Sequence, residues 1–244
     1  MRPKKVVAIF IAYNALKTLK VFYESFPKKL FDEIILVDDA SADNTYSLAK
    51  ELGIRAYRNP KNLGYGGNMK RALALALDLG ADIIVDIHPD NEYLPTSIPS
   101  ALEKMKTKNY QFILGNRFSN LANPLKGGMY IWKILPIIFL NFIDRTILNI
   151  KIDDLHQGFR VYSKSMLEKV NYQANSNNYL FSFELIAQAA FKNVRIGQVP
   201  VEVNYSGKKR GASIKNSIIY SFGTFKILGL FLLARLGIKT QLFK

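Results

Sequence analysis

Residues 34–45 read IILVDDASADNT, an apolar β-branched run that ends in two carboxylates. Ile34–Val37 has the length and composition of a buried strand, and Asp43 is a residue type that caps the helix expected to follow. In an open parallel sheet, ligands bind outside the carboxyl ends of the strands, where loops and helix N-termini converge. Asp38 and Asp39 are therefore predicted to bind a ligand, and Asp43 is interpreted as a cap residue.

The sequence on either side of this segment alternates short apolar runs with amphipathic stretches. Strands are predicted at 6–12, 33–37, 54–57, 83–87 and 111–114, and helices at 16–26, 45–52, 68–79 and 97–106. This alternation is typical of a mostly parallel sheet flanked by helices, so the predicted fold class is α/β. With 244 residues, 49% of them hydrophobic, the chain is long enough for one large domain with a sizeable core.

The composition limits the chemistry that the chain can use. Cysteine is absent, which excludes disulfides and a cysteine nucleophile, so a bound metal would need oxygen or imidazole ligands. The 34 Lys and Arg against 19 Asp and Glu give a formal net charge of +15, which indicates an anionic partner. The basic residues after Glu202 lie among Leu, Ile and Phe rather than on a polar face, which favours an acidic membrane surface over nucleic acid.

Two later segments, 129–150 and 217–238, are nearly long enough to span a bilayer, but each contains charged residues. Charges at mid-bilayer are costly, so both are predicted to lie as helices in the membrane interface, with packing as core helices as the alternative. The predicted organisation is a main domain over 1–215, with 129–150 as an interfacial insertion, and a basic amphipathic, membrane-associating tail over 216–244. The apolar run at 6–12 is too short to span, so we expect a cytoplasmic protein, peripheral on the cytoplasmic face of the membrane.

A second polar cluster follows the fourth predicted strand, where residues 86–92 read DIHPDNE. Pro89 keeps the residue before it extended, so Asp86, His88 and Asp90 are predicted to alternate onto one side of the chain. Carboxylate and imidazole groups gathered at a strand end suit Mg²⁺ or Mn²⁺. A solvated turn is the alternative interpretation.

Three further segments carry candidate residues. Residues 59–68, NPKNLGYGGN, place glycines before a helix and could let the backbone approach a phosphate, although the third glycine of a dinucleotide fingerprint is missing. Arg117 follows the fifth predicted strand and could donate two parallel hydrogen bonds to a phosphate, or form an ordinary surface ion pair. Residues 153–160, DDLHQGFR, bring carboxylate, imidazole and guanidinium groups together around a glycine and form a candidate acceptor site.

Taken in order, these segments resemble the inverting nucleotide-sugar glycosyltransferases of family 2, which have the glycosyltransferase A-type fold, and especially the polyprenyl- or dolichyl-phosphate sugar synthases. The likeness runs from Val7 to about Lys215. Residues 37–45, VDDASADNT, are close to the family's V-D-D-x-S-x-D-x-T motif, and 116–118, NRF, resemble its S-R-[FY]. Residues 154–160, DLHQGFR, look like its D-x-x-x-G-[FY]-R.

The resemblance also assigns roles, with one departure from the family's pattern. The family has D-x-D followed by Gln where this chain has His88, Asp90 and Glu92, so Asp90 alone is unchanged, and these three are the implied ligands of Mg²⁺ or Mn²⁺. The implied nucleotide-sugar-binding residues are Tyr13, Asn14, Asp38, Asp39, Asn62, Gly64, Lys70 and Asp86. The implied acceptor or phosphate ligands are Arg117, Arg160, Arg210 and Lys215, and the implied catalytic residues are Asp90, Asp154 and Arg117.

The activity that the resemblance implies is inverting transfer of a sugar from a UDP- or GDP-sugar to a polyprenyl phosphate at the membrane surface. Such a phosphate is already an anion, so a strong general base is not needed, whereas a saccharide hydroxyl would need Asp154 or Asp153 as base. Cationic groups would neutralise the charge that grows on the departing nucleoside diphosphate. Two alternatives stay open: a glycosyltransferase acting on a saccharide hydroxyl in cell-surface glycan synthesis, and a catalytically silent nucleotide-sugar-binding protein.

Overall fold

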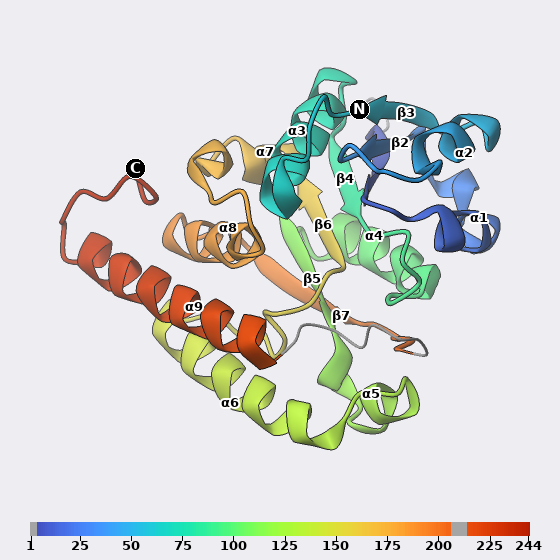
Figure 1. Cartoon of the computed structure of the whole chain (residues 1–244). Helices are drawn as coiled ribbons and strands as arrows, with labels where there is room; N and C mark the ends of the chain where they lie inside the picture. The colour runs from blue at the N-terminus through green and yellow to red at the C-terminus, as the bar shows by residue number, and fades with distance from the viewer. Residues whose placement is uncertain (1–3, 206–213) are drawn as a thin grey trace.

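The computed structural model describes residues 4–205 and 214–244, which form a seven-stranded sheet flanked by helices (Figure 1). The strands are β1 (Val6–Ala12), β2 (Glu33–Asp38), β3 (Arg55–Arg58), β4 (Ile83–Asp86), β5 (Phe112–Asn116), β6 (Arg160–Ser163) and β7 (Ile196–Pro200). Their order in the sheet is β3-β2-β1-β4-β6-β5-β7, and β6 runs antiparallel to both of its neighbours while the other pairs are parallel. The prediction of a mostly parallel α/β sheet is confirmed.

Two layers of helices cover the two faces of this sheet. The helices are α1 (Leu16–Ser25), α2 (Thr45–Glu51), α3 (Gly64–Asp78), α4 (Ile98–Thr107), α5 (Ala122–Lys126), α6 (Ile131–Leu148), α7 (Lys164–Leu167), α8 (Leu180–Phe191) and α9 (Ile214–Arg235). Side chains alternate along a strand, so Ala8 and Phe10 of β1 join the core under α1, α2 and α4. Val7 and Ile9 join the other core, under α3, α8 and α9.

Helix α3 begins at Gly64, one turn earlier than the 68–79 helix that the sequence predicts. The reason is a contact across the sheet edge: the Asp39 carboxylate accepts hydrogen bonds from the backbone amides of Leu63 and Gly64 at 2.9 and 3.0 Å. A carboxylate at this point satisfies amides that have no partner within the helix and stabilises the helix dipole. The remote residue Asp39 therefore sets where the helix starts.

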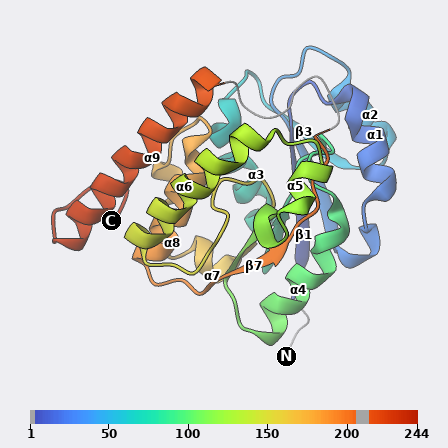
Figure 2. The same ribbon diagram turned by 90° about the horizontal axis from the view of Figure 1, so that it is seen from below.

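The two apolar segments form α6 and α9, which lie side by side along one flank of the molecule (Figures 1 and 2). One face of α9 is core, because Ile227, Leu228 and Phe231 are buried against the body. The opposite face exposes large apolar side chains, among them Phe222 and Phe225. By length and composition Asn216–Arg235 could cross a membrane, yet 28% of that window is buried inside the protein. The alternative prediction, that these segments pack as core helices, therefore holds for the inner face of α9.

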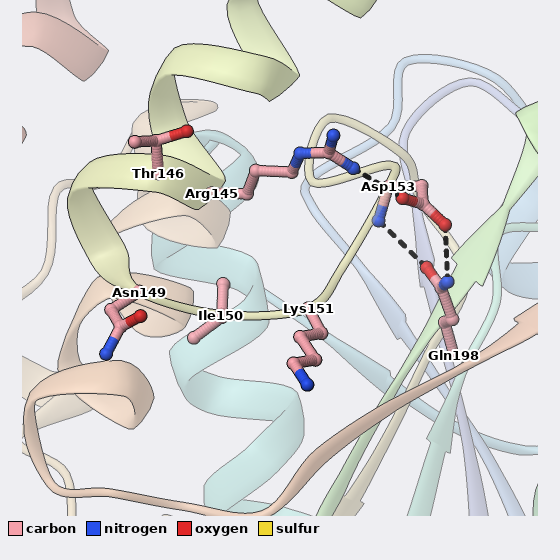
Figure 3. Close-up of a pocket in the computed structure, with 7 residues that line it drawn as sticks. All are labelled: Arg145, Thr146, Asn149, Ile150, Lys151, Asp153 and Gln198. Carbon is pink, nitrogen blue, oxygen red and sulfur yellow. Dashed lines mark hydrogen bonds and ion pairs between the residues drawn. The ribbon is translucent and has the colours of Figure 1, made fainter.

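A polar pocket of about 570 Å³ lies at the C-terminal end of α6 (Figure 3). Asp153 on its wall accepts hydrogen bonds from Arg145 Nη1 and Gln198 Nε2, both at 2.7 Å. Lys151 also lines it. None of the lining residues comes from β1 to β4 or from the loops that follow these strands, where the sequence places the nucleotide site.

Candidate active site

The carboxyl ends of β1, β2 and β4 bring the predicted acidic residues to one edge of the sheet. Asp38 is the register partner of Ala12 at the end of β1, and Asp86 pairs with Ile9 on the other side of the same strand. The antiparallel β6 enters at this edge too, so Arg160 lies opposite Asp86. Because β1 lies between β2 and β4, residues that are far apart in the sequence are separated by one strand in space.

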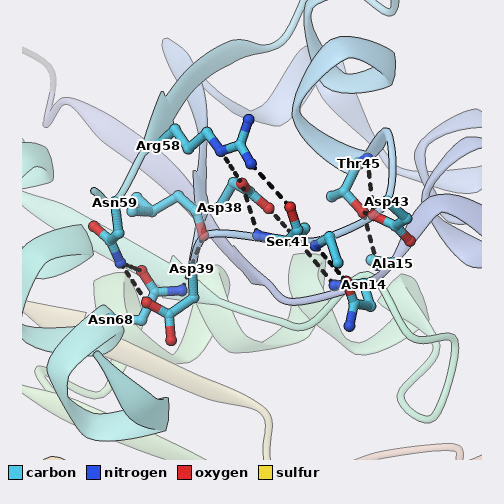
Figure 4. A network of polar contacts seen from close by, with 12 residues as sticks. Asn14, Ala15, Asp38, Asp39, Ser41, Asp43, Thr45, Arg58, Asn59 and Asn68 are labelled. Atoms are coloured by element: carbon cyan, nitrogen blue, oxygen red, sulfur yellow. Dashed lines mark hydrogen bonds and ion pairs between the residues drawn. The ribbon is translucent and has the colours of Figure 1, made fainter. Parts of the chain in front are cut away.

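Asp38 and Asp39 are both buried and accept hydrogen bonds from the protein itself (Figure 4). Asp38 accepts from the amide and hydroxyl of Ser41, and the Nε of Arg58 lies 3.3 Å from its Oδ2. Asp39 accepts from Asn59 Nδ2 at 2.6 Å, in addition to the two amides at the start of α3. The pair therefore builds the two loops of this edge, and direct contact with a nucleotide stays a prediction.

The glycines in the first turn of α3 allow close packing against another loop. A Cβ on Gly64, where φ is +77°, would lie 2.6 Å from the carbonyl oxygen of Asn177, and one on Gly66 would lie 2.2 Å from that of Ser176. The amide of Gly66 donates to Asn177 O at 2.8 Å. The absence of a Cβ thus lets the backbone of residues 176–177 approach these glycines, and contact of this loop with a phosphate stays a prediction.

The other predicted nucleotide ligands surround this edge. Tyr13 is 56% exposed, so its ring is available to a flat ligand such as a base. Asn14 accepts from the amide of Ala42 and connects the first two loops. Lys70 on α3 donates to Asn177 Oδ1 at 2.9 Å, and burial lowers its pKa. The side-chain oxygen of Asn62 accepts a hydrogen bond from the backbone amide of Gly64 at 2.9 Å.

The predicted metal ligands lie on the loop after β4. Asp90 is exposed, and its Oδ1 accepts the amide of Glu92 at 2.9 Å. Burial, and then the negative charge of Asp90, raise the pKa of Glu92 to about 7. The His88 ring turns inward, with Nε2 3.6 Å from Asp86 Oδ1; burial lowers its pKa, but Asp86 and Asp90 outweigh that effect and the net pKa is raised.

These residues fit a divalent cation that takes few protein ligands. Among residues 4–205 and 214–244, no group of three or more His, Asp or Glu side chains is arranged to hold a metal ion. Mg²⁺ commonly takes one or two carboxylates and completes its shell with water and substrate phosphates. Asp90 and Glu92 supply such a pair, because they lie two residues apart on one loop and repel each other. His88 faces Asp86 instead of this pair.

Arg160 is a buried cation with unused hydrogen-bond donors. Arg160 is 2% exposed, and its Nε and Nη1 atoms have no hydrogen-bond partner in the described part of the chain. Asp86, Tyr65 and Tyr162 lie around it, and their influence outweighs burial and raises the pKa of Arg160. The Tyr162 hydroxyl donates to Asp86 Oδ2 at 3.1 Å. Asp86 supplies one counter-charge, and the two donor atoms without a partner among the described residues make this guanidinium suited to bind a further anion.

Arg117 and Asp154 form a buried ion pair. Asp154 accepts from Arg117 Nε at 2.7 Å, from its Nη2 at 2.8 Å and from its backbone amide at 3.0 Å. Arg117 also donates to the Tyr205 hydroxyl and to the carbonyl oxygen of His156. The sequence suggested a phosphate ligand and a general base, but in the structure each group largely satisfies the other.

Some candidate residues lie beyond the description, and others were missed. Arg210 and the side chain of Lys215 fall outside the described part of the structure. Tyr162 was missed, although its position two residues after Arg160 on a strand places both side chains on one face. Tyr65 was also missed, and its only signal was its place among the glycines of residues 64–67, which form the first turn of α3.

A sheet of this order, with acidic and cationic side chains gathered at one edge, agrees with the glycosyltransferase A-type fold that the motifs predict. The model of glycosyl transferase family 2 matches residues 7–170. The chain belongs to this family and is a glycosyltransferase, which confirms the resemblance seen in the motifs.

The chain is similar to relatives of known name over most of its length. It is 28% identical over 223 residues to a UDP-N-acetylglucosamine–dolichyl-phosphate N-acetylglucosaminyltransferase of Methanococcus voltae, covering 84% of this chain and 88% of that one. It is 24% identical over 213 residues to the undecaprenyl-phosphate mannosyltransferase of Micrococcus luteus, covering 81% and 82%.

A solved structure shares the fold at low identity. Glucosyl-3-phosphoglycerate synthase of Mycobacterium tuberculosis, in complex with Mn²⁺, UDP-glucose and phosphoglyceric acid, superposes with a TM-score of 0.70 and 18% identity. The match covers 98% of this chain and 82% of that one. This likeness confirms the fold class.

Proposed function

We propose that this chain transfers a sugar from a nucleotide sugar to a polyprenyl phosphate at a membrane surface, with inversion at the anomeric carbon. The observation that carries the proposal is the buried guanidinium of Arg160, whose Nε and Nη1 have no partner among the described residues. A phosphate oxygen is the natural partner for such a planar donor group. The names of the Methanococcus voltae and Micrococcus luteus relatives, which specify dolichyl and undecaprenyl phosphate, support the same acceptor class.

The contacts that Asp153 and Asp154 make in the folded chain favour a phosphate acceptor over a saccharide hydroxyl. A hydroxyl must lose its proton to a general base, and that base must lie within hydrogen-bond reach of the hydroxyl. Asp154 is buried against Arg117, and Asp153 accepts from Arg145 and Gln198. A phosphate monoester needs no such base, so Arg117 and Asp154 are proposed to shape the acceptor pocket rather than to move a proton.

For the donor, we assign the loop after β4 to the diphosphate. Asp90 and Glu92 would hold a divalent cation together with diphosphate oxygens, and Tyr13 and the loops built by Asp38 and Asp39 would bind the nucleoside. The bound cation supplies charge neutralisation of the departing nucleoside diphosphate. We propose that this cation is Mg²⁺ or Mn²⁺.

For the membrane, we assign the exposed faces of α6 and α9. The large apolar side chains exposed there include Trp132, Leu135, Phe139, Phe142, Phe222 and Phe225. Lys133 and Lys226 lie on the same helices, and the acidic residue of α6, Asp144, is fully buried. Apolar and cationic groups with no exposed acid suit the interface of an anionic bilayer. Attachment to the cytoplasmic face stays a prediction.

The test is a transfer assay with a panel of donors and acceptors. Purified chain is incubated with UDP- and GDP-sugars, with Mg²⁺, Mn²⁺ or EDTA, and with either short polyprenyl phosphates or neutral oligosaccharides. We expect metal-dependent formation of a glycosyl polyprenyl phosphate whose anomeric configuration is opposite to that of the donor. Transfer to oligosaccharides alone would favour the hydroxyl acceptor, and donor binding without any transfer would favour a silent binding protein.

A further inference from the structure

Three segments of the chain meet around the ring of His156. Asp144 of α6 places Oδ2 2.7 Å from His156 Nε2, and the hydroxyl of Tyr220 of α9 lies 3.1 Å from Nδ1. The ring also stacks on Phe183 of α8, with centroids 5.6 Å apart. The His156 side chain is 8% exposed and Asp144 is fully buried, so water competes little for these contacts.

The polarity of the two ring contacts follows from their chemistry. Asp144 Oδ1 has no hydrogen-bond partner among the described residues, so His156 is the partner that the structure gives this buried carboxylate. An ionised carboxylate can only accept, so Nε2 carries a proton. In the neutral ring Nδ1 then accepts from the Tyr220 hydroxyl, and the chain of bonds fixes the ring orientation.

The same residue is connected to the proposed acceptor pocket. The carbonyl oxygen of His156 accepts from Arg117 Nη2 at 2.9 Å. Tyr220 lies close enough to Arg160 and Arg117 that both lower its pKa, although burial and Asp144 keep the net pKa raised. His156 therefore contacts α6 and α9 through its ring and Arg117 through its backbone.

We propose that His156 is a positioning residue that holds the apolar helices α6 and α9 in register with the guanidinium groups of Arg117 and Arg160, so that one acceptor lipid meets both. The inference rests on the proposed function. A polyprenyl phosphate carries its charge and its apolar chain on one molecule, and binding both ends requires the two protein surfaces at a fixed separation. When both ends are engaged, each raises the effective concentration of the other at its site.

The test compares a long polyprenyl phosphate in detergent micelles with a short, water-soluble prenyl phosphate. Tyr220→Phe removes the hydroxyl and keeps the ring. We expect it to raise the KM for the long acceptor about five- to tenfold, which is the size of one lost hydrogen bond. The KM for the short acceptor and the KM for the donor stay at the wild-type values, because neither substrate uses both surfaces.

Two further variants provide a stronger perturbation and a matched control. His156→Asn removes both ring contacts and is expected to change the long-to-short KM ratio more than Tyr220→Phe does. Thr224→Val is the matched control, because Thr224 is buried on the same helix but its hydroxyl bonds to Ser221 O within that helix. Thermal unfolding and circular dichroism confirm that each variant is folded.

The results separate this inference from the proposed function. If Tyr220→Phe and His156→Asn leave the long-to-short KM ratio unchanged, or raise both KM values equally, the positioning role is overturned while the proposed function stands. If the wild-type chain transfers to neither acceptor, the proposed function has failed and the inference fails with it.

Discussion

The buried ion pair of Arg117 and Asp154 makes a quantitative prediction about the site. The side chains are 6% and 0% exposed, and Asp154 accepts three hydrogen bonds from Arg117 at 2.7 to 3.0 Å. Asp154→Ala leaves the guanidinium buried without its counter-charge. Removing one partner of a buried pair costs about 3–5 kcal/mol. We therefore expect a large loss of stability at a residue that the motif marks as catalytic.

The loss is measurable as a shift in the unfolding temperature. For a chain of about this length, 1 kcal/mol shifts Tm by about 2–4 °C, so Asp154→Ala should lower Tm by about 6–20 °C. The double variant Arg117→Met with Asp154→Leu removes both charges and should recover most of the loss, because no unpaired charge is left. Calorimetry or thermal circular dichroism reports both values.

A surface pair provides the control. Lys164 and Glu168 are 3.9 Å apart and 50% and 60% exposed, so Glu168→Ala should change stability by less than about 1 kcal/mol. Asp154→Asn keeps the shape of the side chain and should retain measurable transfer to a polyprenyl phosphate, since no base is required. A Tm for Asp154→Ala within a degree of the wild-type value would refute the reasoning.

Three other predictions address the donor site, the glycine loop and the membrane face. Asp90→Ala should abolish metal-dependent transfer without changing Tm, because its carboxylate is exposed; wild-type turnover would contradict the metal assignment. Gly66→Ala should destabilise the fold by more than about 2 kcal/mol, because the added Cβ would lie 2.2 Å from the carbonyl oxygen of Ser176. Gly229→Ala is the control: its Cβ would meet nothing within 4 Å, so thermal unfolding should show a neutral or stabilising effect. Phe222→Asp should weaken co-sedimentation with anionic vesicles and leave Tm unchanged, because Phe222 is 71% exposed; undiminished binding would exclude this face of α9.

The alternation of apolar runs and amphipathic stretches predicted the first five strands and the first four helices. Helix α8 was not predicted, because its sequence, LFSFELIAQAAF, is apolar on nearly all sides and its residues from Phe181 to Ala190 are buried. A helix surrounded by core has no polar face, and therefore no 3.6-residue pattern to find. The antiparallel strand β6 is four residues long and was not predicted either.

The motifs predicted which residues gather at the sheet edge, but the partners of those residues could not be read from them. Arg117 and Asp154 are 37 positions apart, and each was interpreted by its own local motif. Whether a guanidinium is paired or available depends on what else is buried beside it, and that is decided by packing. The same holds for Arg160, two of whose donor atoms have no hydrogen-bond partner among the described residues.

The sequence by itself determined the α/β class, the family and the sheet edge that carries the site, because strand periodicity and motif order are properties of neighbouring residues. The tertiary structure alone decided which charges neutralise one another, and that His156 contacts Asp144 of α6, Tyr220 of α9 and Arg117. Hydrogen bonds and ion pairs act over a few ångströms, and only the folded chain brings groups from distant segments within that range.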